Sequence, residues 1–597
     1  MRIKHFFGLA VLAAMTASCS SNNELVNGGN GSGENESGAS YASITIKLPT
    51  TSGTRAANDD FNEGTTSEYA VNDATLLIFQ KVGESENEYK YIETAELGNL
   101  DPWKNDKTTG ITTESTTITA KLEQATAGEN GDYYALVILN NKDKNDAEKV
   151  TLPTGTTTYG EWNVAAHATE TKLVDNTKGF YMANAPEFKA ADQEPTTLVP
   201  IKGIYRTKEE AQNKPGTTVH VERGLAKVTV GSNSTSNYFA IGGASATGTK
   251  YSNDKVEITD WALDVTNKSS FPVHVTSGLK AGITPTDPTA QKVPAYADIW
   301  NNETAAAGTA ATSRFVSQLN TTGAFKRVYW GIDPNYSMGL SDLAKCKAQF
   351  TLAEADGKGV TWKKGSGSDN PLYCLENTFD IKNMTQGQTT RVLLKATYTP
   401  KALETETETD KTFFMIGNSS DFWTKATLEK QIKSKAEEVL NTTTGVTATL
   451  KGNLLEGGTH VLDENNVEIK SGEDDKTADV VKEINKKFGL DMSKGIGIKT
   501  YKEGVSYYIA RIKHFGDDLT PWKEGDATYD GENQKWLGRY GVLRNNWYDL
   551  KIEKISGPGY PDVPEVKPET PDDEDTKYIS VSVKILDWAK RSQSVEL

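Results

Sequence analysis

The sequence predicts a mainly all-β protein with two tandem β-sandwich domains, the larger C-terminal one carrying a few helices. Short apolar runs alternate with stretches rich in Gly, Thr, Ser and Asn, which is typical of loop-rich β proteins. Many runs show the period-2 alternation of half-buried strands. The chain has 597 residues, enough for two or more domains of about 150 residues each. A formal net charge of −16 argues against nucleic-acid binding, which depends on basic surface.

The first 18 residues have the features of an export signal. Arg2 and Lys4 supply positive charge, residues 6–14 are apolar, and small residues lead up to Cys19. This order is typical of bacterial lipoproteins, in which cleavage before the cysteine frees it for acylation. Acyl chains on Cys19 would then anchor the precursor to the outer membrane. Thr16 stands where leucine is commonest, so the alternative is an ordinary signal with an incidental cysteine.

A polar spacer precedes the first amphipathic strand pattern of the mature chain. Ile44, Ile46 and Leu48 alternate with polar residues, which predicts a half-buried strand. A polar, flexible stretch with a single arginine, Arg55, follows at residues 50–60. Proteases cut such segments, although an ordinary surface arginine is the alternative.

Further strand patterns divide the chain into two units. Residues 74–79 and 134–139 are near-continuous apolar runs, which predicts strands buried on both faces in an N-terminal sandwich, residues 56–215. A long strand pattern, with an irregularity at Gly224 that suggests a bulge, opens a C-terminal sandwich at residues 216–560. A domain of that length must hold insertions or a subdomain.

Two helices are expected inside the larger unit. Residues 425–440 and 477–488 carry apolar residues at helical spacing, and Gly489 is a natural C-terminal stop for the second helix.

The sequence offers no motif for catalysis, a metal site or a cofactor. None of the six histidines lies in a zinc-binding arrangement, and phosphate-loop and nucleophile-elbow patterns are absent. Cys346 and Cys374 form an even pair once Cys19 is assigned to the signal. A disulfide between them fits an exported protein, and two separate buried thiols are the alternative.

The C-terminal tail, residues 577–597, contains a strand without a sequential neighbour. Its alternate positions carry four β-branched residues, Ile579, Val581, Val583 and Ile585. It follows an acidic, proline-rich segment, residues 561–576, which we expect to be an extended linker that does not fold back. The strand must therefore pair far back in its own chain or with another molecule.

Motifs spread over the chain resemble those of the fimbrillins, the type V pilins of the Mfa-like family. They are the signal ending at Cys19, the strand at residues 43–48 followed by an arginine, the apolar strands around Leu76 and Leu136, and the segments VERGLAKV (221–228), ITDWALDVTNK (258–268), YWGIDPNY (329–336), YCLENT (373–378) and YGVLRNNWY (540–548), with Asp587-Trp588 in the tail. The order of these motifs along the chain carries the resemblance.

The resemblance implies two β-sandwich domains of the transthyretin-like pilin type and a lipidated propeptide, residues 19–55. An arginine-specific surface protease would cut between Arg55 and Ala56 and release the first strand. The groove left behind would take the donor strand of a neighbouring subunit, which comprises Ile579, Val581, Val583, Ile585 and Trp588. The expected partners are other copies of this chain and accessory fimbrial subunits.

The residues themselves agree with this implication. The donor strand and the released strand share one alternation, so one can replace the other on the same core. We therefore expect a stalk subunit of a surface fimbria, with no enzymatic activity. In the uncut precursor the tail should lie loose or dock weakly. The alternatives are a fimbrial tip adhesin, a monomeric glycan-binding surface lipoprotein and an exported hydrolase without a recognisable motif.

Overall fold

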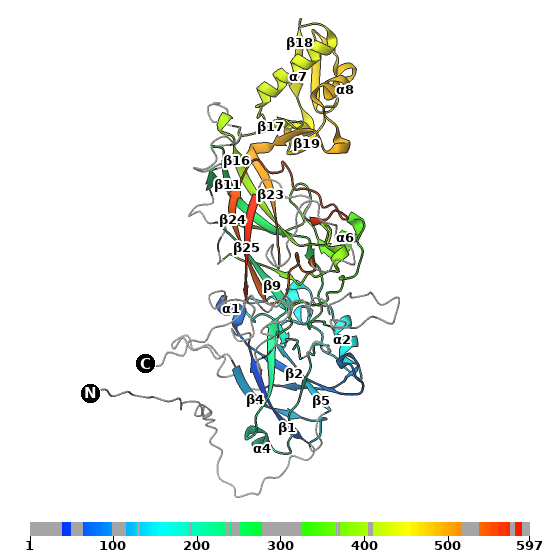
Figure 1. Cartoon of the computed structure of the whole chain (residues 1–597), viewed down its shortest axis with the longest axis vertical. Helices are drawn as coiled ribbons and strands as arrows, with labels where there is room; N and C mark the ends of the chain where they lie inside the picture. Colours follow the sequence, from blue (N-terminus) through cyan, green and yellow to red (C-terminus); the bar gives the residue numbers. More distant parts are fainter. Residues whose placement is uncertain are drawn as a thin grey trace, which may run out of the picture.

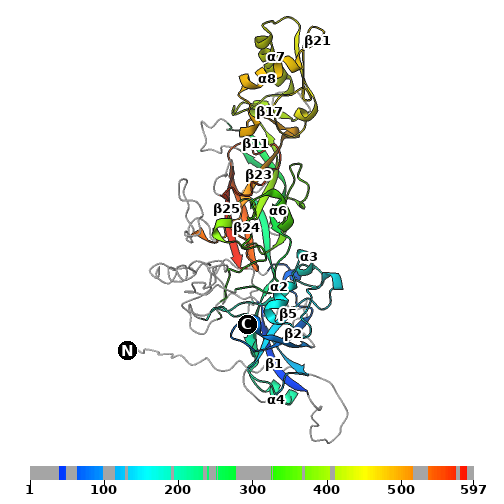
Figure 2. The same cartoon turned by 90° about the vertical axis from the view of Figure 1, so that its right-hand side faces the viewer.

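The computed structural model describes residues 39–48, 64–97, 115–127, 132–189, 194–232, 238–240, 251, 253–276, 325, 327–365, 367, 370–403, 410–514, 536–572 and 579–587. The molecule is long and narrow (Figure 1), with the N-terminal sheet at one end and a small α/β subdomain at the other. A central sandwich lies between them, and the same order is seen after a quarter turn (Figure 2). The prediction of a mainly β protein with tandem sandwich domains is confirmed.

The N-terminal domain is built on one eight-stranded sheet in the order β3-β2-β5-β6-β8-β1-β4, with β7 paired to β5. Its strands are β1 (Ser40–Lys47), β2 (Ala74–Gln80), β3 (Lys90–Glu96), β4 (Ser115–Leu122), β5 (Tyr133–Leu139), β6 (Met182–Asn184), β7 (Val199–Pro200) and β8 (Thr217–Arg223). Its short helices are α1 (Thr66–Tyr69), α2 (Tyr159–Ala165), α3 (Glu170–Leu173) and α4 (Lys208–Gln212).

Strands β2 and β5 are buried on both faces, as their continuous apolar sequences predict. Leu76 and Ile78 point into the core that also contains β1. The intervening Leu77 and Phe79 belong to a second cluster, which helix α2 and residues of the C-terminal domain complete. The outer face of the N-terminal sheet therefore serves as part of the contact between the domains.

The central sandwich has two main sheets. One has the order β10-β11-β16-β23 with β14 on β11, and the other has the order β15-β9-β24-β25. The strands are β9 (Leu225–Ser232), β10 (Tyr238–Ala240), β11 (Lys255–Asp264), β14 (Trp362–Lys364), β15 (Leu372–Leu375), β16 (Arg391–Thr399), β23 (Val505–Arg511), β24 (Asn546–Ile555) and β25 (Ile579–Asp587). A two-stranded ladder, β12 (Thr266–Asn267) with β13 (Phe350–Thr351), and helix α6 (Leu343–Gln349) lie beside them.

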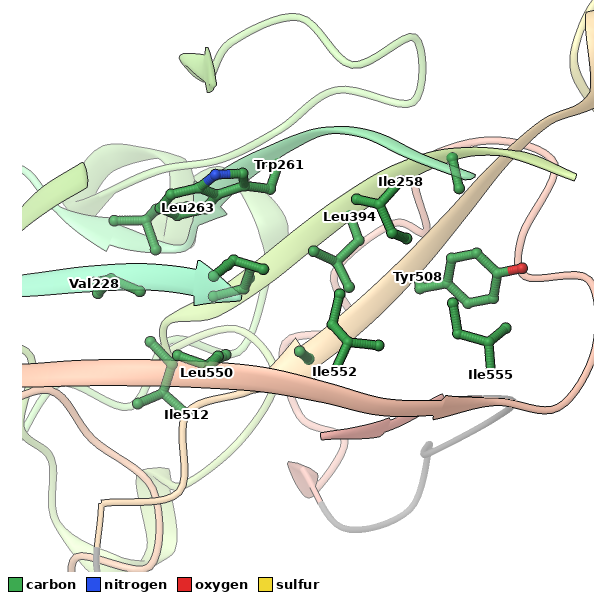
Figure 3. Packing of buried hydrophobic residues seen from close by; sticks show 14 of the residues in the cluster. Val228, Ile258, Trp261, Leu263, Leu394, Tyr508, Ile512, Leu550, Ile552 and Ile555 are labelled. Carbon is green, nitrogen blue, oxygen red and sulfur yellow. The ribbon is translucent and has the colours of Figure 1, made fainter. Parts of the chain in front are cut away.

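The core of this sandwich joins both sheets (Figure 3). Trp261 from β11 and Leu394 from β16 pack in one cluster with Leu550 and Ile552 from β24. These side chains are almost entirely excluded from solvent, so burial of apolar surface holds the two sheets together.

The chain passes from one domain to the other at Gly224. Strand β8 pairs with β1 and β6, whereas β9, which begins one residue later, pairs with β15 and β24. The change of sheet thus lies at Gly224 rather than at residue 216, and the irregularity is a crossing between sheets and not a bulge. A side chain at Gly224 would meet Leu173 and Tyr181 at 3.2 Å, so a glycine suits this crossing.

Buried ion pairs join the domains on both sides of this crossing. Glu68 of α1 accepts a hydrogen bond from Lys227 Nζ, with 2.9 Å between Nζ and Oε1, and its backbone carbonyl accepts from Arg223. Glu222 of β8 binds Arg327 at 2.6 Å. Because both ends of each pair are shielded from water, removing one partner alone would leave a buried charge uncompensated.

The α/β subdomain is an insertion between β16 and β23, which pair with each other directly from Thr397↔Val505 onward. It comprises β17 (Phe413–Ile416), α7 (Lys425–Leu440), β18 (Val446–Leu450), β19 (Gly458–His460), β20 (Val467–Ser471), β21 (Asp474–Asp475), α8 (Thr477–Phe488) and β22 (Ile498–Tyr501). Both predicted helices are confirmed with the predicted bounds, and Gly489 ends α8 at a φ of 68°. The subdomain has its own apolar core.

The predicted disulfide is wrong, because Cys346 and Cys374 are both free, buried thiols. Cys346 lies on α6 in a small cluster with Val566, whereas Cys374 lies on β15 in the main sandwich core. The two residues pack in different clusters. Burial raises the pKa of the Cys346 thiol to about 11 and that of Cys374 further, so both thiols stay protonated and unreactive at neutral pH.

Candidate functional site

The predicted first strand is present and lies inside the N-terminal sheet. Strand β1 is antiparallel to β4 along its whole length and parallel to β8 from Ile44 to Lys47. In the sheet, β1 therefore lies between β8 and β4 and is paired with both. We call the place it occupies, between these two strands, the β1 slot.

The alternate residues of β1 fill the centre of the domain core. Ala42, Ile44 and Ile46 are completely buried, and Leu48 is 3% exposed. They pack with residues from β2, β4, β5 and β8, which include Leu76, Leu122, Val137 and Val219. At about 1.5–3 kcal/mol each, the three larger side chains contribute roughly 5–9 kcal/mol, an upper figure because the unfolded chain already hides part of this surface.

Polar contacts fix the position of β1 along the slot. The backbones of Tyr41 and Tyr205 exchange two hydrogen bonds of 2.8 Å. The hydroxyl groups of Thr45 and Thr117 lie 2.8 Å apart across the β1–β4 pair. Gly216 makes room for Thr45, because a Cβ at Gly216 would stand 2.6 Å from the threonine Oγ1. Thr45 is half-buried, and the missing side chain at Gly216 lets its hydroxyl group approach the start of β8 closely.

One wall of the slot is held independently of β1. Glu93 on β3 accepts hydrogen bonds from the backbone N–H groups of Glu123, Gln124 and Ala125, with N···O distances of 2.7, 3.1 and 2.8 Å. These residues form the turn that follows β4, so Glu93 ties β4 to the far edge of the same sheet. The other wall, β8, is paired with β6 on its opposite side. If β1 is removed, β8 keeps its pairing with β6, and the turn after β4 keeps its three hydrogen bonds to Glu93.

A histidine of β8 lies beside the last residue of β1. His220 on β8 stands opposite Lys47 in the parallel register, and its ring stacks on Phe325 with 3.9 Å between centroids. Burial, with a smaller effect from the charge of Lys47, lowers the pKa of His220 to about 4. The neutral imidazole is therefore the form that accompanies bound β1.

The C-terminal tail forms strand β25 within the same chain, which differs from the expected loose tail. β25 is antiparallel to β24 over its full length, with Val583 opposite Leu550 and Val581 opposite Ile552. It completes the edge of the β15-β9-β24 sheet. The physical reason is that β24 would otherwise present an unpaired edge in a monomer, and the nearest strand available is the tail.

The acidic segment is not a free linker over its described part, residues 561–572. Val563 and Val566 pack in apolar clusters on the central sandwich. Asp572 is buried and forms an ion pair of 3.0 Å with Arg511, whose Nε also donates to the Asp572 carbonyl. Thr389 donates a further hydrogen bond to Asp572. The expectation of an extended segment that does not fold back is wrong here, because two valines supply apolar contacts and arginines compensate the acidic charge.

Several predicted sites lie outside the described residues. These are Cys19, the cleavage position Arg55–Ala56 and Trp588. For residues 579–587 the structure gives the backbone pairing alone. Among the residues that are described, no cluster of His, Cys, Asp and Glu could hold a metal ion. No helix within the described ranges has the length and apolarity needed to cross a membrane.

Sequence reasoning missed the residues that shape the slot. Glu93, Gly216 and His220 sit in ordinary strand or loop sequence, and each acts on a residue at least 30 positions away. Their only sequence signal is an uncommon residue type in an apolar or strand context, such as an acid inside a strand.

The structure combines two tandem β-sandwich domains with a first strand inserted in one sheet and a C-terminal strand at the edge of another. Residues 499–594 match the family model described as major fimbrial subunit protein type IV, fimbrillin, C-terminal. The resemblance to fimbrillins is confirmed, and the match supports the role of a subunit of a cell-surface fimbria. Fimbrillins are structural proteins, which agrees with the prediction of no enzymatic activity.

Similar solved structures include a fimbrilin from Porphyromonas gingivalis, with 11% identity, 92% of this chain and 99% of that chain covered, and a TM-score of 0.36. A tip fimbrial protein from the same organism, truncated at its C-terminus, has 9% identity, coverages of 92% and 100%, and a TM-score of 0.30. At these TM-scores the likenesses support no conclusion about this chain by themselves. No curated protein matches the chain.

Proposed function

We propose that this chain is a stalk subunit of a surface fimbria and polymerises by exchange of strands. The precursor is a lipoprotein acylated on Cys19 and cut between Arg55 and Ala56 by an arginine-specific protease. The cut removes β1, and the C-terminal strand of a neighbouring subunit enters the β1 slot. The single observation that carries the proposal is the position of β1, the first strand that the structure describes, which lies inside a sheet with its apolar residues in the core.

The energetics of an empty slot favour the exchange. Loss of β1 exposes the facing edges of β8 and β4, together with the apolar surface that Ile44, Ile46 and Leu48 cover. Pairing with a new strand satisfies the exposed strand edges and covers the apolar surface at the same time. The cut is required first, because β1 is held at high effective concentration for as long as it belongs to the same chain.

The tail must leave β24 before it can enter another slot. In the precursor β25 is paired with β24 of its own chain. The donor strand therefore gives up this pairing when it enters the slot of another subunit. The exchange is favourable because a strand at the sheet edge has one hydrogen-bonded neighbour, whereas a strand in the β1 slot has two. A chain that can lose its first strand and also carries a donor strand has both ends that a growing stalk needs, which favours a stalk subunit over a tip adhesin.

Replacement of Arg55 tests the processing step. The Arg55→Ala precursor should reach the cell surface and remain monomeric, and the Arg55→Lys variant should behave in the same way if the protease requires arginine. SDS-resistant ladders on unboiled gels are the measurement. Ladders formed by the Arg55→Ala protein would show that removal of β1 at this position is not needed.

Removal of the tail tests the donor strand. A chain that lacks residues 578–597 should be exported and cut, with Ala56 at its N-terminus, but should not polymerise. Added wild-type protein should bind its slot and cap it. Fibres that consist of the truncated chain alone would contradict the role of the tail.

A further inference from the structure

The tail repeats the sequence of β1 position by position. Residues 41–48 read YASITIKL, and residues 578–585 read YISVSVKI. Tyrosine, serine and lysine recur at the same positions. At the apolar positions the tail has isoleucine or valine where β1 has isoleucine, alanine or leucine, and at one polar position it has serine where β1 has threonine. The likeness therefore includes the polar residues as well as the apolar alternation.

From this repeat we infer that the donor strand enters the β1 slot in the direction of β1 and in one register, with residue 578 in the place of residue 41. The inference rests on the proposed strand exchange and specifies its geometry. Strand β1 runs parallel to β8 and antiparallel to β4, so the donor strand takes the same orientation. Val581 then lies opposite Ile118 of the neighbouring subunit, and Ser582 lies opposite Thr117.

The apolar residues alone do not select a direction. Ile579, Val581, Val583 and Ile585 are evenly spaced, and the slot accepts apolar side chains at residues 42, 44, 46 and 48. The set fits equally well when the strand is reversed. Selection must come from the polar residues between them.

Lysine 584 selects the direction. In the proposed register Lys584 takes the place of Lys47, which is exposed, and Lys577 takes the place of Ser40, which is 6% exposed and is the first residue of β1. In the reversed strand Lys584 takes the place of Ser43, which is 5% exposed and lies inside β1, with paired residues on both sides. Burial of an unpaired ammonium group is costly, so the reversed strand is disfavoured.

The same kind of argument selects the register. A slip of two residues in one direction brings Lys584 to the place of Thr45, beside Gly216, and removes the hydroxyl group that meets Thr117. A slip of two in the other direction brings Lys577 to the place of Ala42, which is completely buried. Without a slip, Ser582 replaces Thr45 and keeps a hydroxyl group beside Thr117.

Engineered cysteine pairs test the direction and the register. Directly opposite residues of an antiparallel pair have Cβ atoms about 4.5–5.5 Å apart, and a small local movement brings them to the roughly 3.5–4.5 Å that a disulfide requires. In the proposed geometry Ser580 replaces Ser43 and lies opposite Thr119, whereas in the reversed strand it replaces Lys47 and lies opposite Ser115. The native thiols, Cys346 and Cys374, are buried and give a low background.

Three double variants are therefore compared after polymerisation and mild oxidation. Ser580→Cys with Thr119→Cys should lose its monomer band to ladders that survive boiling without reductant. Ser580→Cys with Ser115→Cys should keep its monomer band. Ser582→Cys with Thr117→Cys should also crosslink, since residue 582 takes the same place in both directions and reports on the register alone.

Crosslinking of the Ser115 pair in place of the Thr119 pair would overturn the direction. Polymers that form normally but show no crosslink in any variant would overturn the register, while strand exchange itself would stand. A wild-type cut protein that does not polymerise, or that polymerises without its tail, would instead refute the proposed function. Single-cysteine variants, which have no partner thiol in the slot, are the matched controls.

Discussion

Replacement of Ile44 by alanine should destabilise the precursor and leave the mature polymer unchanged. Ile44 is completely buried at the centre of the N-terminal core. Truncation of a buried isoleucine to alanine costs about 2–5 kcal/mol, because apolar contact is lost and a cavity remains. In the proposed mechanism β1 is discarded after the cut, so this cost applies only while β1 is present.

The matched substitution in the tail should have the opposite effect. Val581 takes the place of Ile44 in the inferred register, and Val581→Ala should weaken the contact between subunits by about 1.5–3 kcal/mol. The N-terminal domain of the Val581→Ala precursor should keep its stability. Lys47→Ala, at an exposed position of β1, is the control that should change neither measurement.

Two measurements separate these outcomes. Urea unfolding with hydrogen exchange of β4 amides reports on the precursor, since β1 is the strand that pairs with β4. Dissociation of the polymer in SDS at increasing temperature reports on the assembled subunits. An Ile44→Ala polymer as weak as its precursor would refute the reasoning, because β1 would then still be part of the mature subunit.

Three further predictions concern charge. Burial lowers the pKa of His220 to about 4, below its usual value near 6.5, so the stability that the neutral imidazole contributes to bound β1 is complete above pH 6.5 and is lost as the pH falls toward 4. The cut precursor should therefore release its β1 peptide more readily at pH 5 than at pH 7.5, and His220→Gln should remove the difference in a mass-spectrometric assay. Glu93→Ala should leave three backbone N–H groups after β4 without their acceptor. We expect faster hydrogen exchange of the β4 amides and slower polymerisation in the cut protein, with the uncut Glu93→Ala protein as the comparison. Glu68→Gln should lower the free energy of unfolding by about 3–5 kcal/mol, measured by chemical unfolding, because Lys227 stays buried and charged. Adding Lys227→Met should recover much of that loss. An equal or larger loss in the double variant would contradict the argument.

The sequence predicts well where one local pattern decides the structure. The alternation of Ile44, Ile46 and Leu48 sets a strand and its buried face, and helical spacing with Gly489 sets both bounds of α8. These features depend on residues that are near one another in the chain. The predicted elements accordingly agree closely with β1, β2, β5, α7 and α8 of the structure.

The errors arise where a partner is distant in the sequence. Nothing near Gly224 distinguishes a bulge from a crossing between sheets, since that depends on which strands lie beside it. Two cysteines alone do not reveal that their helix and strand pack in different clusters. Repulsion between its charges predicts that the acidic segment is extended, but Arg511, 61 positions away, forms an ion pair with Asp572.

The anchoring of Asp572 determines how force would pass along a fibre of these subunits. With residues up to 572 packed on their own domain, the tether to the donor strand shortens from about 50 Å for sixteen free residues to about 23 Å for the seven steps from 572 to 579, at ~3.3 Å per residue. In the proposed fibre the distance from Asp572 to the start of the donor strand could then not exceed about 23 Å. A pull on the fibre would reach the ion pair of Asp572 with Arg511 before any other part of the central sandwich. That buried pair would bear the tension first and so reduce the load on the sheet behind it.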